Sequence, residues 1–106
     1  MLLCFAHMSD IALTDEQIEK ALHDLPEWQR KGDQLQRTFE FADFKAAMAF
    51  MVRVAFEAEA QGHHPEWSNV YNQVDVSVKT HHSGDKITAK DITLAAAIDR
   101  VAAAAN

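Results

Sequence analysis

The first part of the chain changes from helical to strand spacing of its apolar residues. Segment 14–17 (TDEQ) fits a helix capping box, and Pro26 is expected to end the helix that begins there. The apolar residues between them recur with the spacing of one helix face: Ile18, Ala21, Leu22 and Leu25. After turn residues at 31–33, an alternating set predicts a strand that pairs with the preceding segment as a β-hairpin: Leu35, Arg37, Phe39 and Phe41.

Residues 43–60 carry the clearest helical pattern. One expected apolar face consists of Phe44, Ala47, Met48, Met51, Ala55 and Ala58. Phe50, Val54 and Phe56 lie off that face, which gives this helix more apolar surface than one sheet can cover. Two interpretations stay open, a broad core helix or a second apolar face used for self-association. Gly62 is suited to end the helix.

The last third of the chain predicts two strands and a final helix. Residues 67–72 predict a short strand in which Trp67 and Tyr71 pack, and residues 73–80 a longer one whose valines alternate with polar residues. Residues 83–85 form a loop, and the last helix begins at Thr88 with Asp91 at the capping-box position. The order α-β-β-α-β-β-α predicts the α+β class, an antiparallel sheet with helices on one face.

Length, charge and cysteine content limit the class of protein. The 106 residues are 48% apolar, enough for one core; residues 1–9 are expected to be a flexible leader and residues 10–106 a single domain. No apolar run approaches the about 18 residues of a membrane span. The net charge of −6 argues against direct binding of nucleic acid, which requires clustered basic residues. The lone Cys4 has no partner for a disulfide, which favours the cytoplasm.

Histidines are the candidate chemistry, because four of the six lie in two adjacent pairs. The pair 63–64 follows the long helix and the pair 81–82 follows the last strand, so both could meet at one rim of the sheet. An imidazole has an unperturbed pKa near 6.5 and can give or take a proton at neutral pH. Zinc is the competing interpretation, but the helical HExxH spacing is absent. Glu59 and Asp91 could orient an imidazole, or simply be a solvated helix edge and a capping residue.

Segment 59–72, EAQGHHPEWSNVYN, closely resembles the pterin-4a-carbinolamine dehydratase family. Further matching positions run through about residues 12–103. They are Leu25, Trp28, Phe39, Glu40, Phe41, Phe44, Val74, Thr80, His81, Gly84, Thr88, Asp91, Ile92, Leu94, Ala95 and Ile98. The resemblance implies a four-stranded antiparallel sheet with three helices packed on one face, assembled into dimers or tetramers.

The resemblance also implies an activity. The family removes water from 4a-hydroxytetrahydropterin, the carbinolamine left by aromatic amino-acid hydroxylases, and yields quinonoid dihydropterin in tetrahydrobiopterin recycling. The reaction needs an acid for the departing hydroxyl and a base for the adjacent ring nitrogen, and no metal or other cofactor is implied. By position, His63, His64 and His81 are expected to be catalytic. The expected substrate-binding residues are Glu59, Gly62, His63, His64, Lys79, Thr80, His81, His82 and Asp91.

Two positions depart from the family pattern. Gly62 stands where Asp or Asn is common, and His82 where an acidic residue is common. Neither replaces one of the three histidines, so we expect dehydratase activity. The alternative is a non-catalytic oligomeric coactivator or assembly module, because animal members are also dimerisation cofactors of a homeodomain transcription factor. Expected partners are a pterin, further copies of the chain as a homodimer or homotetramer, and an aromatic amino-acid hydroxylase to which the reaction is coupled.

Overall fold

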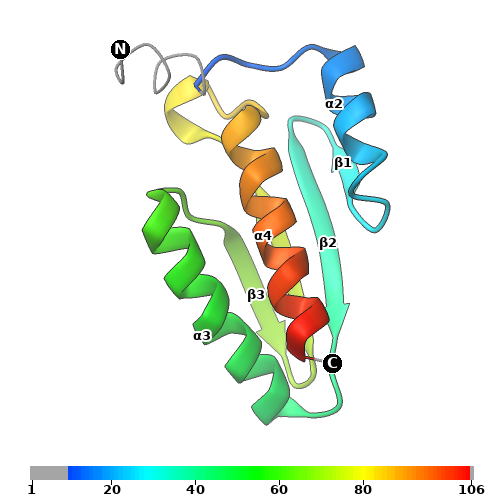
Figure 1. Cartoon of the computed structure of the whole chain (residues 1–106), viewed down its shortest axis with the longest axis vertical. Coiled ribbons are helices and arrows are strands. Elements are labelled where there is room, and N and C mark those ends of the chain that lie inside the picture. The colour runs from blue at the N-terminus through cyan, green and yellow to red at the C-terminus, as the bar shows by residue number, and fades with distance from the viewer. Residues whose placement is uncertain (1–9, 106) are drawn as a thin grey trace.

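The computed structural model describes residues 10–105, and the leader expected over residues 1–9 lies outside the described residues. Along the chain these residues form α2 (Asp15–Leu22), β1 (Gln29–Lys31), β2 (Gln34–Glu40), α3 (Phe44–Gln61), β3 (Glu66–Val70), β4 (Gln73–Val78), the short 3₁₀ helix η1 (His81–Ser83) and α4 (Ala89–Ala105) (Figure 1). The predicted order of helices and strands is confirmed. Within residues 10–105 no helix is both long and apolar enough to cross a membrane.

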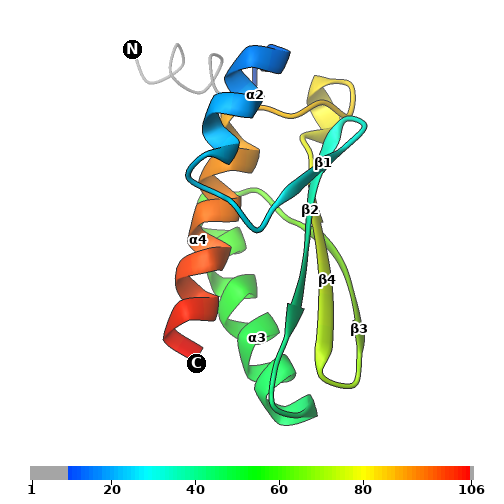
Figure 2. The same cartoon turned by 90° about the vertical axis from the view of Figure 1, so that its right-hand side faces the viewer.

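The four strands form one antiparallel sheet in the order β1-β2-β4-β3. Helices α3 and α4 lie against the same face of this sheet, as the side view shows (Figure 2). Strand alternation explains why that face is apolar: Val74, Val76 and Val78 of β4 are all buried, and the residues between them point the other way. The predicted α+β architecture, with a covered and an open sheet face, is confirmed.

The core-facing side of α3 differs from the predicted one. Its buried residues are Ala47, Phe50, Val54 and Ala58. Phe50 lies within 4.8 Å, centroid to centroid, of two aromatic rings of the hairpin and the loop after it, so it is the centre of the core. Phe44 and Phe56, by contrast, are exposed, Phe56 by 73%. The aromatic partners on β2 and in the loop after it select the Phe50 face, and α3 keeps a second apolar face toward solvent.

Two local predictions are wrong in their boundaries. Helix α2 ends at Leu22 rather than just before Pro26, because His23 closes it and the next residues continue as turns. Leu25 is nevertheless buried in the core. Tyr71 is not a strand residue: it lies in the turn between β3 and β4 with φ = 50° and an exposed side chain. Trp67, as predicted, packs against the core.

Arg37 occupies a strand position on the face that points to the core. Its charge is accommodated there by contacts with an aromatic ring and a carboxylate. Its guanidinium lies 4.2 Å from the Phe39 ring centroid and 2.7 Å from the Asp99 carboxylate of α4. The Trp28 indole donates a second hydrogen bond, of 2.8 Å, to the same carboxylate. These contacts join the hairpin to the second half of α4. The first half of α4 contacts the histidine region instead.

Candidate active site

Both histidine pairs converge on one rim of the sheet, as predicted. Helix α3 ends at Gly62, whose left-handed φ of 64° turns the chain sharply into the first pair. Strand β4 runs antiparallel to β3, so its end returns to the start of β3 and η1 places the second pair there. Together these segments enclose an open cavity of about 260 Å³. It is lined by Gly62, His63, His64, Pro65, Glu66, His81 and His82.

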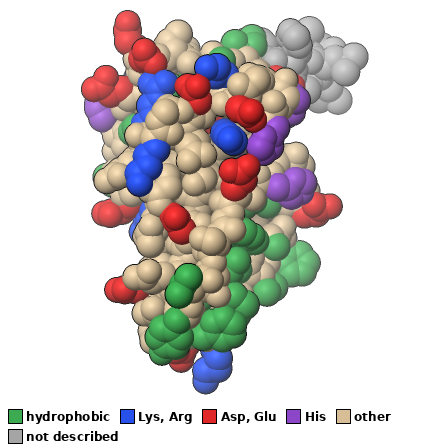
Figure 3. All heavy atoms as spheres, turned by 180° about the vertical axis from the view of Figure 1, so that it is seen from behind, with side chains coloured by type: hydrophobic (Ala, Val, Ile, Leu, Met, Phe, Trp, Pro, Cys, Tyr) green, Lys and Arg blue, Asp and Glu red, His purple; other side chains and the backbone are tan. Residues whose placement is uncertain are grey.

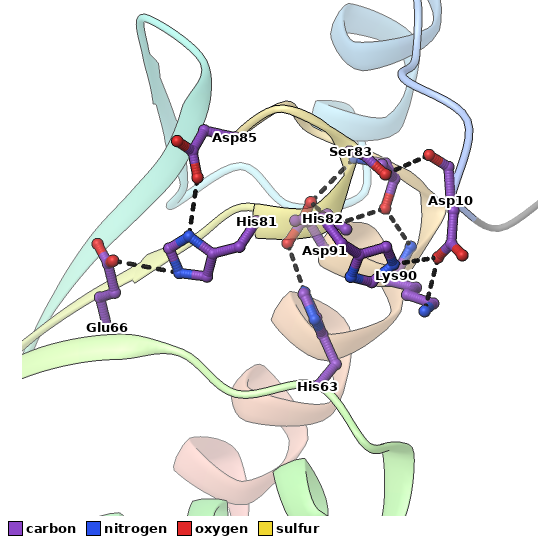
Figure 4. A network of polar contacts seen from close by, with 11 residues as sticks. Asp10, His63, Glu66, His81, His82, Ser83, Asp85, Lys90 and Asp91 are labelled. Carbon is purple, nitrogen blue, oxygen red and sulfur yellow. Dashed lines mark hydrogen bonds and ion pairs between the residues drawn. The ribbon is translucent and has the colours of Figure 1, made fainter.

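His63 and Asp91 form the buried floor of the site. His63 is 8% exposed, and its Nε2 lies 2.6 Å from Oδ1 of Asp91, which is completely buried at the start of α4 (Figure 4). The other carboxylate oxygen accepts the backbone N–H of Thr88, which is one half of the predicted capping box; the Thr88 hydroxyl accepts from the backbone N–H of Lys90 instead of that of Asp91. Asp91 therefore has both of the roles weighed for it: it caps α4 and holds an imidazole.

His81 lies at the open mouth of the cavity between two carboxylates. Its Nδ1 is 2.8 Å from Asp85 and its Nε2 is 3.4 Å from Glu66. His64 is also exposed, and its Nε2 lies 2.9 Å from Glu59 on the last turn of α3. Each of the three histidines expected to be catalytic thus has a carboxylate beside it, one buried and the others solvated.

The fourth histidine belongs to a separate ion cluster at the edge of the cavity. His82 Nε2 lies 2.9 Å from the Asp10 carboxylate, and the Lys90 ammonium lies 2.6 Å from the same oxygen. The Ser83 hydroxyl donates to the Asp10 backbone carbonyl. The ammonium, followed by the imidazole, holds the pKa of the Asp10 carboxyl below its ordinary value. This cluster ties the start of the described chain to η1 and α4.

The structure gathers part of the predicted site and separates the rest. Gly62 and all four histidines of the two pairs line the cavity, and Glu59 and Asp91 lie behind two of them. Lys79 and Thr80 do not line it: strand alternation points Thr80 into the core, where it is fully buried, and Lys79 toward the opposite side.

Sequence reasoning missed three carboxylates beside the histidines: Glu66, Asp85 and Asp10. Asp85 follows His81 by four residues, a spacing that could have suggested it. Glu66 comes from the neighbouring strand, and Asp10 is far away along the chain, so only the fold brings them to the rim. Among residues 10–105, no group of three His, Cys, Asp or Glu side chains is arranged to hold a metal ion.

The geometry fits proton transfer to and from a small ligand. Three imidazoles line one cavity of about 260 Å³, just below the about 300–1,000 Å³ typical of small-molecule sites, and each has a carboxylate beside it. A second cavity, of about 340 Å³, lies on the other side of His63 and is lined by Gln61, His63, Ala89, Lys90 and Thr93. The fold and this rim define a small α+β domain with a cluster of histidines at one cavity.

Comparison with known proteins identifies the family. The family model for pterin 4 alpha carbinolamine dehydratase matches residues 11–101, so the chain belongs to this family. A protein of Opitutus terrae named after this enzyme is 48% identical over 89 residues, covering 84% of this chain and 92% of the relative. A protein of Rhodospirillum rubrum with the same name is 50% identical over 91 residues, covering 84% and 94%.

Solved structures agree with the fold. The crystal structure of a transcriptional coactivator/pterin dehydratase from Brucella melitensis has a TM-score of 0.81 and 40% identity, covering 86% of this chain and 98% of that one. A pterin dehydratase-like protein described as a RuBisCO assembly factor in the alpha-carboxysome has a TM-score of 0.58 at 24% identity. It covers 71% of this chain and 86% of that one, and shows the fold alone.

Proposed function

We propose that the protein is a pterin-4a-carbinolamine dehydratase, a hydro-lyase that converts 4a-hydroxytetrahydropterin into quinonoid dihydropterin and water. One observation carries the proposal: the adjacent His63 and His64 line a single cavity with His81, which is distant from them along the chain. The relatives at about 50% identity over most of the chain carry the name of this activity, which supports it independently.

The histidines suit the two proton transfers that the reaction needs. The bond between C4a and the hydroxyl oxygen breaks, an acid protonates the departing hydroxyl to water, and a base removes the hydrogen of the adjacent ring nitrogen. The electron pair of that N–H bond forms the new C=N bond, so neither oxidant nor reductant is consumed. We propose that His63, His64 and His81 supply these groups. Positioned acid–base groups contribute about 10²- to 10⁴-fold each.

The decisive experiment follows dehydration of freshly generated 4a-hydroxytetrahydropterin with and without the protein. We expect a catalysed rate proportional to protein concentration. A rate equal to the uncatalysed one would contradict the proposal and favour the non-catalytic coactivator or assembly module of the same fold. The retained histidines argue against that alternative, since a protein that only assembles with a partner has no need of them.

We further propose that turnover needs no metal, as imidazoles can perform both proton transfers. Turnover is expected to be unchanged after exhaustive chelation, with the metal content checked by elemental analysis. Loss of turnover on chelation, and its return with zinc, would instead support the zinc interpretation.

The exposed apolar face of α3 supports self-association with a second copy of the chain. Phe44, Val52 and Phe56 are exposed there, and the space-filling view shows an apolar patch below the histidines (Figure 3). Such a patch marks an interaction site in soluble proteins. A copy of the same chain is the proposed occupant, as a closed homo-oligomer buries the same patch on each subunit.

Light scattering tests this proposal. We expect a mass of two or four times 11.9 kDa. Phe56→Lys should lower the oligomer mass, whereas Ile11→Lys, at another exposed apolar residue, should leave it unchanged. A monomer at micromolar concentration would rule out the oligomer. The cytoplasmic location and the coupling to an aromatic amino-acid hydroxylase stay predictions.

A further inference from the structure

A chain of buried hydroxyl groups runs beneath His63. The side chains of Thr80 and Thr88 are fully buried, and their hydroxyl oxygens lie 2.7 Å apart. Thr80 donates its hydroxyl hydrogen to Oδ2 of Asp91 over 2.9 Å. The same Oδ2 accepts the backbone N–H of Thr88, and the Thr88 hydroxyl oxygen accepts the backbone N–H of Lys90. None of these threonine hydroxyls reaches the cavity.

The direction of each hydrogen bond in this chain is determined by counting hydrogens. Thr80 has one hydroxyl hydrogen and gives it to Asp91, so the Thr88 hydroxyl must donate to Thr80. Oδ2 of Asp91 then receives two donors and cannot itself carry a hydrogen. An ionised carboxylate has acceptors only and no donor. Oδ1 is therefore left as an acceptor, facing Nε2 of His63 at 2.6 Å.

We infer that Thr80 and Thr88 are positioning residues. Their donors occupy Oδ2 of Asp91 and leave Oδ1 to accept from His63, and this fixes the tautomer of His63. His63 carries its hydrogen on Nε2, toward Asp91, and keeps a free lone pair on Nδ1 in a ring that lines the cavity. The catalytic consequence rests on the proposed function: Nδ1 is the His63 nitrogen that exchanges protons with the pterin. The tautomer itself does not rest on that function.

The wild-type protein gives the first test. In protein labelled with ¹⁵N at histidine, long-range ¹H–¹⁵N correlations distinguish the two neutral tautomers at about pH 8, where an ordinary imidazole is uncharged. We expect the Nε2–H form for His63. A predominant Nδ1–H form would overturn the inference without any substitution.

Asp91→Asn tests the threonine donors directly. Thr80 and Thr88 still need an acceptor, so the amide oxygen must replace Oδ2 and the amide NH₂ must face His63. His63 is then forced to accept at Nε2 and to move its hydrogen to Nδ1. Retention of the Nε2–H tautomer in the folded variant would show that the threonines do not fix the tautomer of His63. A purely structural role of the threonines predicts no tautomer change.

Thr80→Val removes the donor while keeping the shape and strand preference of the residue. We expect kcat to fall about three- to tenfold, the worth of one such hydrogen bond, with little change in KM, and Thr80→Ser to restore it. Thr38→Val, on the open face of the sheet, is the matched control. Equal kcat in Thr80→Val and wild type would overturn the inference that these threonines contribute to catalysis through His63. The expected tautomer in a protein without dehydratase activity would instead refute the proposed function and leave the positioning intact.

Discussion

The floor and the mouth of the histidine cavity carry the same side chain in opposite surroundings. His63 at the floor is 8% exposed and held by a carboxylate that is itself completely buried. The His81 side chain at the mouth is 61% exposed and lies between Asp85 and Glu66, which are solvated as well. The ring at the floor has one fixed orientation, whereas water competes for every contact of the ring at the mouth.

This difference shows what each carboxylate contributes. An exposed ion pair adds about 0–1 kcal/mol, because water and salt screen it. A buried acceptor left without its partner, or a buried donor left without its acceptor, costs about 1–3 kcal/mol. The surroundings of His63 therefore belong to the folded core, and those of His81 can adjust when a substrate enters.

The largest expected effect comes from the histidines themselves. His63→Ala and His81→Ala should each fold and each lose about 10²- to 10⁴-fold in turnover, as for acid–base groups, and His64→Ala should behave likewise. The double variant of His63 and His81 should lose much less than the product, because removing one partner already disables the other. Turnover is measured beside circular dichroism.

His82→Ala is the matched control for these variants, since His82 pairs with Asp10 at the cavity edge. Its turnover should change far less than that of the other three. Near-wild-type turnover in the folded double variant of His63 and His81 would show that the rim is structural.

The second-largest expected effect is a difference in the free energy of unfolding between variants of a buried and of an exposed carboxylate. Asp91→Asn should lower the free energy of unfolding by about 1–3 kcal/mol, because neutral hydrogen bonds of the amide replace the stronger hydrogen bonds that Thr80, Thr88 and His63 make to the carboxylate. Glu66→Gln, an equivalent change at the mouth, should cost no more than about 1 kcal/mol. Urea unfolding measures both, and equal losses would contradict the contrast between floor and mouth.

Much of the fold could be predicted from the sequence because local chemistry determines it. The capping box at Thr14, the hydrogen bond from the Thr88 backbone to Asp91, the alternating valines of β4 and the glycine after α3 each depend on neighbouring residues. The core face of α3 could not be predicted in this way, because Phe50 is selected by aromatic rings from distant segments. Helical spacing alone favoured the face of Phe44, which is exposed, over that of Phe50, which is buried.

The same distinction between local features and contacts of distant segments applies to the site. The paired histidines are visible in the sequence, and the family resemblance indicated which three to expect. Their partners depend on tertiary contacts: Asp91 meets His63 across 28 positions, and Glu66 reaches His81 from another strand. Thr80 was expected to contact substrate because of its position, but the alternation of the β4 chain buries it instead.

A smaller effect is expected for the carboxylates at the mouth. Asp85→Asn and Glu66→Gln remove the negative charges beside the two nitrogens of His81. Each pair is exposed and contributes at most about 1 kcal/mol, so turnover should fall less than about fivefold. The fall should shrink further at high salt, which screens exposed charges. A loss as large as that of His81→Ala would mean that these carboxylates act in the chemistry directly.

The smallest effect concerns Asp10, whose pKa is lowered mainly by the Lys90 ammonium and then by His82. A lowered folded pKa contributes stability that is present above the unfolded value, about 3.9, and is lost as the pH falls through the folded pKa. Lys90→Met should therefore raise the pKa of Asp10 and reduce the stability lost on acidification below about pH 4. Carboxyl NMR titration with thermal unfolding measures both. Lys86→Met is the matched control, because Lys86 lowers the pKa of Asp33 instead. An Asp10 titration unchanged by Lys90→Met would show that the ammonium does not set it.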